Sequence, residues 1–349
     1  MLLAICVNRM APRTGIPADS GRHVSSTSDA FHINIAASLP IAPGQHRSMK
    51  KHVALVNDHR WIDPSEQTAY SRNILEEDRI LSEAFAARGI QVSRVDWADA
   101  KIDWHGFDAI VIRQTWDYFE RLDEFRAWLD RVEACTRVIN PVEVIRWNCD
   151  KRYLLDLDAA GVPTVPTIVI EQRKTAPGLG TLLARHGFSD AVVKPAVSGA
   201  GRETYRVRRD EAPGLESTWN RLVAEESMLL QPFMPAIVEQ GEVSLVIIDG
   251  EFSHAVRKIA AAGEFRVQDD HGGTVHEHTP TPTEIRIAEQ AIVEVPGDVA
   301  YARVDLVDSE SGPCVMELEL IEPELFFRQN IKTAARLAAA VARIIRGVV

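Results

Sequence analysis

The sequence predicts an α/β fold class, with a doubly wound parallel-sheet domain on the N-terminal side and an α+β region after it. From residue 52 to about 145, short apolar runs alternate with segments of helical period, which is typical of a parallel sheet covered by helices. From 167 to 325 short apolar runs dominate and few helical segments intervene. The length of 349 residues leaves room for two or three domains.

The spacing of apolar residues defines the elements of the N-terminal domain. Val53–Asn57 is a short apolar run that is typical of a buried strand. A helix is predicted over Asn73–Arg88, because apolar side chains recur there at spacings of three and four and Gly89 then stops the helix. The other predicted elements are strands at Val92–Trp97, Ala109–Arg113 and Arg137–Ile139 and a helix at Phe125–Ala134.

The second region begins at Asn140-Pro141 and is predicted to be mostly β. Asp249-Gly250 is a strong signal for a hairpin between two strands. The predicted strands are Ala191–Lys194, Tyr205–Val207, Met228–Gln231, Val243–Ile248, His254–Ile259, Tyr301–Val307 and Cys314–Leu320, and the predicted helices are Lys151–Ala160, Pro282–Val293 and Lys332–Arg346.

Residues 1–48 differ from the rest, because they carry four Arg and two Asp but no Glu and no Lys. We expect that the start codon is assigned too far upstream and that translation truly starts at Met49. A flexible tail and an organelle transit peptide are the alternatives for residues 1–48. The predicted division is therefore a leader at 1–48 and a parallel-sheet domain at 49–145, followed by the remaining residues 146–349.

The charge balance excludes several classes of partner. The formal net charge is −11, so binding to nucleic acid or to an anionic membrane surface is not expected, since both need a basic surface. The four cysteines lack CxxC spacing, which disfavours a zinc ribbon or a disulfide framework and favours the reducing cytoplasm. No uncharged apolar run reaches the roughly 18 residues of a membrane span.

A first candidate site follows the strand that ends at Lys194. Small residues come after it, among them Ser198, Gly199 and Gly201. Small residues let backbone N–H groups approach phosphate oxygens, and the lysine adds a positive charge. A plain hairpin turn with an exposed lysine explains this segment alone equally well.

A second candidate site consists of carboxylates on two strands. Glu317 and Glu319 are two residues apart, so they face the same side of a strand, and Asp305 on a neighbouring strand can join them. Hard oxygen ligands of this kind suit Mg²⁺ or Mn²⁺. The alternative is a solvated face of an edge strand, which the apolar neighbours make less favourable.

Cationic side chains form the third candidate site, and two residues of the first domain form a fourth. Lys258, at a strand end, and Arg266 could hold a transferring phosphoryl group, with surface salt bridges as the alternative. Arg113 and Asp117 follow a strand of the parallel sheet, where ligands of such sheets lie. We expect them to bind the carboxylate and ammonium of an amino-acid-like substrate, and Trp116 and Tyr118 to pack between domains.

Together these clusters resemble the ATP-grasp superfamily, in its glutathione-synthetase-like branch, over roughly Asn140 to Pro323. The order of the motifs agrees throughout, beginning with Asn140-Pro141 and then Asn148 and Lys151. The resemblance implies an ATP-grasp fold of two α+β subdomains, a small lid subdomain at 146–232 and a C-terminal metal and nucleotide subdomain at 233–349. It also implies that 49–145 is an N-terminal substrate domain. Two departures stand out: Glu319 replaces the usual asparagine, and Lys258 stands where arginine is more frequent.

The resemblance also implies roles for individual residues. Lys151 and Lys194 would contact the ATP phosphates, and Asp305, Glu317 and Glu319 would hold the metal. Gln231 and Phe233 lie in a segment that looks like the hinge whose backbone holds adenine. Glu239 or Glu242 stands where an acidic residue near the ribose is expected.

Within this branch, the segments 113–118 and 317–323 look like proteins similar to the cycloserine-forming cyclo-ligase, which closes O-ureido-serine into a ring. The implied activity is an ATP-dependent carboxylate–amine ligase that forms an acylphosphate on an amino-acid-like substrate, with ADP as product and Mg²⁺ or Mn²⁺ as cofactor. Lys258 and Arg266 would stabilise the transferring group. The implied partners are small-molecule carboxylates and amines, and relatives in this branch suggest a homodimer or homotetramer.

Other functions are weighed against this one. An ATP-binding protein without ligase activity would need no complete set of lysines and acids. A zinc hydrolase could use His271, His276 and His278, but no HExxH context accompanies them. A serine hydrolase is disfavoured, because GxSxG is absent.

Overall fold

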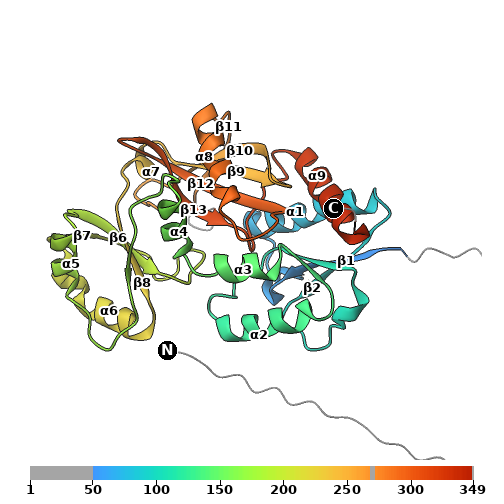
Figure 1. The fold of residues 1–349 in the computed structure, drawn as a ribbon, viewed down its shortest axis with the longest axis horizontal. Helices are drawn as coiled ribbons and strands as arrows, with labels where there is room; N and C mark the ends of the chain where they lie inside the picture. The colour runs from blue at the N-terminus through green and yellow to red at the C-terminus, as the bar shows by residue number, and fades with distance from the viewer. Residues whose placement is uncertain (1–49, 268–271, 348–349) are drawn as a thin grey trace, which may run out of the picture. The chain divides into compact units, whose positions relative to one another are not determined.

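The computed structural model describes residues 50–267 and 272–347, so the expectations for residues 1–48 and for His271 concern residues outside the described ranges. The described residues contain a four-stranded parallel sheet, a four-stranded antiparallel sheet and a five-stranded antiparallel sheet (Figure 1). The predicted fold class is confirmed. The two antiparallel sheets lie within the predicted ranges 146–232 and 233–349.

The parallel sheet has the strand order β2 (Gln91–Asp96), β1 (His52–Asn57), β3 (Ala109–Ile112) and β4 (Arg137–Ile139). Its helices are α1 (Ala69–Ala86), α2 (Leu122–Glu133) and α3 (Val142–Asn148), with short 3-10 turns at His59–Trp61 and Trp104–Gly106. Helix α1 begins earlier than the apolar spacing predicts, because the Thr68 side chain accepts the backbone N–H of Ser71 and caps the helix there.

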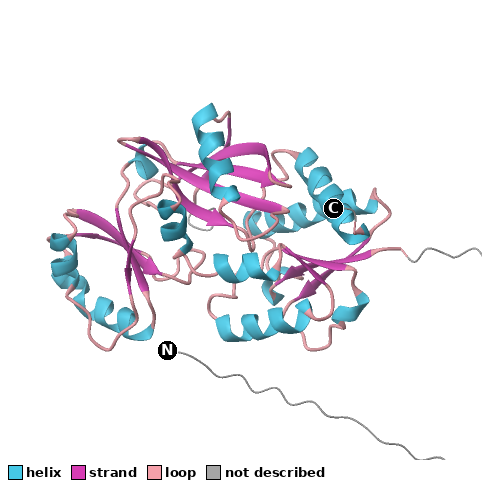
Figure 2. Cartoon of the chain, in the orientation of Figure 1, coloured by secondary structure: helices cyan, strands magenta, loops and turns pink. Residues whose placement is uncertain are grey.

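The four-stranded antiparallel sheet has the order β5 (Ile168–Ile170), β8 (Met228–Pro232), β6 (Asp190–Pro195) and β7 (Tyr205–Arg208). Helices α5 (Leu179–Arg185) and α6 (Ala212–Glu225) cover one of its faces (Figure 2), where Leu182 and Trp219 pack against Val193. The sequence pattern does not predict these helices. Pro213 and Gly214 in the first turn of α6 obscure its helical period.

The five-stranded sheet carries the carboxylate cluster. Its order is β11 (Thr274–His278), β10 (Glu251–Ile259), β9 (Glu242–Ile248), β12 (Tyr301–Ser309) and β13 (Gly312–Glu319). Asp249 and Gly250 have positive φ values of 58° and 76°, so the predicted β9–β10 hairpin turn is confirmed. Helices α4 (Tyr153–Ala159) and α8 (Pro282–Val293) pack on one face through Leu154 and Ile287, and α7 (Ala236–Glu239) precedes β9.

The other face of this sheet shares a core with the N-terminal domain. Leu55 and Phe85 of that domain cluster with Val246, Tyr301 and Leu337, the last from the C-terminal helix α9 (Ile331–Arg346). The Tyr301 hydroxyl donates to main-chain carbonyl oxygens and lies 3.0 Å from that of Ile112 and 2.8 Å from that of Ile321. This shared core fixes the end of β3 beside the segment that follows β13.

His254 makes the docking of α9 sensitive to acid. Its Nδ1 lies 3.0 Å from the hydroxyl of Thr333 in α9, and burial lowers its pKa to about 4. Since the unfolded chain binds the proton with an ordinary pKa near 6.5, the folded protein is expected to lose up to about 3 kcal/mol as the pH falls from 6.5 to 4.

The acid dependence can be measured by urea unfolding at a series of pH values. His254→Asn should flatten this part of the stability curve, because an amide does not titrate in this range. The exposed His105→Asn serves as the control and should keep the wild-type slope. An unchanged slope in His254→Asn would show that other groups cause the acid loss.

Among the residues that the structure describes, no helix combines the length and the apolar composition needed to cross a membrane.

Candidate active site

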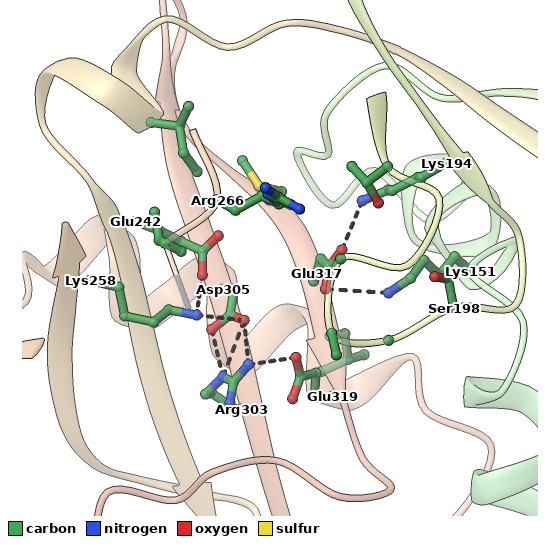
Figure 3. A pocket seen from close by; sticks show the side chains of 18 of the residues that line it. Lys151, Lys194, Ser198, Glu242, Lys258, Arg266, Arg303, Asp305, Glu317 and Glu319 are labelled. Carbon is green, nitrogen blue, oxygen red and sulfur yellow. Dashed lines mark hydrogen bonds and ion pairs between the residues drawn. The ribbon is translucent and has the colours of Figure 1, made fainter. Parts of the chain in front are cut away.

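A pocket is lined by residues of both antiparallel sheets and of the N-terminal domain (Figure 3). The four-stranded sheet contributes Lys194 and Gln231, the five-stranded sheet contributes Lys258, Asp305 and Glu317, and the N-terminal domain contributes Tyr70, Trp116 and Tyr118. The predicted clusters of lysines and carboxylates therefore meet in one place.

Glu317 lies between the two predicted phosphate-binding lysines. Lys194 Nζ donates to its Oε1 at 2.8 Å, and Lys151 Nζ lies 3.3 Å from its Oε2. The backbone N–H of Lys151 bonds to the Ala196 carbonyl, which ties Lys151 to the segment after β6. Burial alone would raise the pKa of Glu317, but Lys151 and Lys194 outweigh burial and hold it well below its usual range.

Asp305 is the centre of a second network. The Arg303 guanidinium donates to both carboxylate oxygens, at 2.9 Å from Oδ1 and 2.9 Å from Oδ2, and Lys258 Nζ lies 3.3 Å from Oδ2. Burial alone would raise the pKa of Asp305, but Arg303 and Lys258 hold it below its usual value. Arg303 also pairs with Glu319, and Lys258 pairs with Glu242.

The predicted metal ligands occupy the pocket but do not form a metal-binding group as they stand. Asp305 on β12 lies opposite Glu317 on β13, and Glu319 is two residues further along β13. Within residues 50–267 and 272–347, no three acidic, histidine or cysteine side chains converge closely enough to hold a metal ion. Their oxygen donors suit Mg²⁺ or Mn²⁺, and a metal would replace the lysine and arginine partners that now hold them.

The loop after β6 approaches the N-terminal domain closely. Ser198, Gly199 and Gly201 line the pocket. A Cβ on Gly199 would lie 2.5 Å from the ring of Phe119, so only glycine fits there. Gly201 has a φ of +68°, in the left-handed region that glycine favours. The loop therefore passes close to Phe119 and presents small residues to the pocket, and its role in binding phosphate stays a prediction.

The predicted adenine hinge has an apolar surrounding. Gln231 and Phe233 line the pocket, with apolar residues at Val165, Val192, Met234, Ile237, Phe265 and Met316. The Gln231 side chain donates to the Thr167 hydroxyl at 2.8 Å, and the Phe233 backbone N–H donates to the Asp190 carbonyl at 3.0 Å. The backbone N–H of Phe233 is therefore already hydrogen-bonded within the protein.

Of the two acidic residues proposed near the ribose, the structure brings one to the site. Glu242 is buried and lines the pocket, and burial raises its pKa to about 7. Glu239, at the end of α7, is exposed and is not among the lining residues. Arg266 lines the pocket as predicted and pairs with Glu264 at 2.6 Å.

Arg113 and Asp117, which we expect to bind the substrate, are not among the residues that line this pocket. Arg113 is fully buried; it donates to the Pro323 carbonyl at 3.3 Å, and its Nε lies 3.6 Å from Asp78. Asp117 accepts the Trp97 indole N–H at 2.7 Å and pairs with Arg121. Both side chains are buried among these partners, whereas Trp116 and Tyr118 line the pocket.

Sequence reasoning missed Arg303 as a pocket residue, and it favoured solvated surface over an extension of the carboxylate site for Glu322 and Glu324, which both line the pocket. Arg303 could have been found, because it is two residues from Asp305 and therefore shares its face of β12. The histidines of the zinc alternative do not support it: His278 lies beside Glu284 and His276 beside the Thr274 hydroxyl, and neither lines the pocket.

Comparisons with known proteins extend over both regions. Residues 53–140 match the N-terminal domain family of D-cycloserine synthetase DcsG, and residues 163–310 match the ATP-grasp domain family of prokaryotic glutathione synthetase. The cycloserine biosynthesis protein DcsG of Streptomyces lavendulae is 36% identical over 285 residues, which cover 75% of this chain and 91% of DcsG. The chain belongs to the DcsG family of ATP-grasp ligases.

Structural comparison agrees with this family membership. A crystal structure of D-cycloserine synthetase DcsG superposes with a TM-score of 0.74 at 32% identity, over 84% of this chain and 99% of that one. A D-alanine–D-alanine ligase from Bacillus anthracis, 15% identical with a TM-score of 0.60 over 85% of this chain and 98% of its own, shows the same fold. This member of the DcsG family is an ATP-dependent ligase that forms C–N bonds with release of ADP, and such ligases use Mg²⁺ or Mn²⁺.

Proposed function

We propose that this ligase closes O-ureido-serine into the cycloserine ring. The observation that carries the proposal is the 36% identity with a cycloserine biosynthesis protein along 91% of that protein. The match includes the N-terminal domain, which supplies Tyr70, Trp116 and Tyr118 to the pocket. An enzyme that resembled this chain only in the ATP-grasp part would have the same nucleotide site but would lack these three aromatic residues of the pocket.

In the proposed reaction, a carboxylate oxygen of the substrate attacks the γ-phosphorus of ATP, ADP leaves, and an acylphosphate forms. Lys151, Lys194 and the backbone of 198–201 bind phosphate oxygens, and Lys258 and Arg266 oppose the charge on the transferring group. The oxygen-bound nitrogen of the ureido group then attacks the acyl carbon, loses its proton and displaces phosphate. The ring nitrogen still carries the carbamoyl group, which water removes as carbon dioxide and ammonia to give cycloserine. No protein nucleophile is needed, since positioning and charge stabilisation suffice.

Asp305, Glu317 and Glu319 would hold the metal, which supplies neutralisation of the phosphate charges. The present pairing suggests how the site stays stable before the nucleotide binds. Four cationic side chains, Lys151, Lys194, Lys258 and Arg303, offset the carboxylates. When the nucleotide binds, phosphate oxygens can then pair with the lysines, while the carboxylates bind the metal.

The proposal is tested by incubating the purified chain with Mg-ATP and O-ureido-serine. We expect one ADP released for each ring formed, with the ring detected by mass spectrometry and neither product formed without ATP. Pooled amino acids provide a second arm, in which ADP release with dipeptide formation would indicate intermolecular ligation. ADP release that does not depend on O-ureido-serine, or no ring product, would contradict the proposal.

We further infer that the enzyme acts in the cytoplasm on small molecules. Cys149 and Cys314, both buried, and Cys135 are free thiols, as is usual in a reducing compartment. Assembly into a homodimer or homotetramer stays a prediction, which light scattering would test.

A further inference from the structure

One part of the pocket wall is aromatic and acidic and takes no part in the network around the lysines. It is formed by Tyr70, Trp116 and Tyr118 and by residues of the segment that follows β13, among them Glu322 and Glu324. The Trp116 indole N–H donates to the Glu322 carbonyl at 3.1 Å. The Trp116 ring stacks on Tyr70, with 6.1 Å between ring centroids. The segment after β13 is therefore held against the N-terminal domain.

The carboxylates of the pocket differ in their partners. Five of them pair with a cationic side chain of the protein: Glu242 with Lys258, Asp305 and Glu319 with Arg303, Glu317 with Lys194, and Glu324 with Arg328. In the described part of the chain, the sixth pocket carboxylate, Glu322, forms no ion pair with any Lys, Arg or His. Lys151 and Arg303 favour its ionised form only from beyond ion-pair distance.

The surroundings of Glu322 make an unpaired carboxylate unfavourable. Burial, with the negative charge of Glu319 nearby, raises the pKa of Glu322 to about 8. Its charge in turn contributes to the raised pKa values of Tyr118 and Cys149, in both cases after burial itself, which places the carboxylate close to those side chains. A cation from a ligand would stabilise the ionised form at this position.

We propose that Glu322 binds the α-ammonium group of the substrate, with the rings of Trp116 and Tyr70 beside it. The inference rests on the proposed function in one respect, namely that the substrate is an amino acid. The ion pair and the π faces both favour a cation over a neutral group. Glu319, whose negative charge acts on Glu322, is itself paired with Arg303 of the neighbouring strand β12 (Figure 3).

This assignment has a consequence for which nitrogen reacts. An ammonium that is held by a carboxylate keeps its proton and has no free electron pair. It is therefore not a nucleophile, and the acyl carbon is left to the ureido group, whose oxygen-bound nitrogen closes the five-membered ring. Glu322 would thus contribute to specificity twice, by selecting an α-amino acid and by withholding its amine from the reaction.

The test measures the preference for the ammonium group by calorimetric titration in the presence of Mg²⁺ and a non-hydrolysable ATP analogue. The two probes are O-ureido-serine and its analogue with hydrogen in place of the α-ammonium. Wild type should bind the ammonium compound about 10- to 100-fold more tightly, as expected for a hydrogen-bonded charge. Glu322→Gln should reduce this ratio to within about threefold, and Glu322→Asp should retain part of it.

Glu310→Gln is the matched control, because it removes the same charge from the exposed turn between β12 and β13 and should keep the wild-type ratio. The inference is overturned if wild type shows no preference or fails to bind the ammonium compound, or if Glu322→Gln keeps the preference. If wild type forms the ring but Glu322→Gln keeps the wild-type affinity ratio between the two probes, this inference alone is wrong. If Glu322→Gln loses the affinity ratio but wild type forms no ring, only the proposed function is wrong.

Discussion

Replacing Glu317 by glutamine is expected to lower the rate of ADP release by about 10³-fold, the scale seen when one electrostatic contact to the reacting group is lost. Glu317 holds both Lys194, at 2.8 Å, and Lys151, at 3.3 Å, and it is a proposed metal ligand. Because these lysines keep its pKa well below the usual range, the carboxylate is charged at any assay pH, and glutamine removes a full charge. The measurement is steady-state ADP release with saturating O-ureido-serine.

The control separates loss of chemistry from loss of folding. Glu310→Gln makes the same substitution on the exposed β12–β13 turn and should retain wild-type turnover. Thermal unfolding of Glu317→Gln should show a folded but less stable protein, because Lys151 and Lys194, with 12% and 8% of their side chains exposed, lose a charged partner. Turnover close to wild type in Glu317→Gln would show that neither the lysine pairing nor the metal assignment is right.

Most of the strands and most of the charged site were predictable because they depend on local patterns, whereas the short strand β5 was not predicted. The run Arg137–Ile139 and the helix Pro282–Val293 are found with the bounds that the sequence predicts. Lys194 and Glu317 were predicted for one site because each follows from its own strand and from the order of motifs. The structure adds that they contact each other directly.

The parts that could not be predicted depend on contacts between distant segments. Arg113 follows a strand, as ligand-binding residues do, but Asp78 of α1 and the carbonyl of Pro323 draw it into the core. No local pattern encodes a partner that is 210 positions away. Tyr70 was missed for a related reason: it is in the first turn of α1, which the apolar spacing did not include, and it lines the pocket only because of how α1 packs.

The substitution Arg303→Lys tests the residue that the sequence analysis did not select. It is expected to lower the turnover number by about 10²-fold or more, with a smaller change in the KM for ATP. The planar guanidinium donates to both oxygens of Asp305, pairs with Glu319 and lies 3.3 Å from the Glu324 carbonyl. A lysine ammonium keeps the charge but cannot reproduce this fork.

The matched control is Arg286→Lys on the exposed side of α8, which should behave as wild type in both turnover and unfolding. A double-mutant cycle with Asp305→Asn then asks whether Arg303 acts through Asp305. If it does, the double variant should be little worse than either single variant, with a coupling of about 1 kcal/mol or more. Fully additive losses would mean that Arg303 acts on the substrate independently of Asp305. Turnover within about threefold of wild type in Arg303→Lys would mean that positive charge alone suffices and that the bidentate geometry does not contribute.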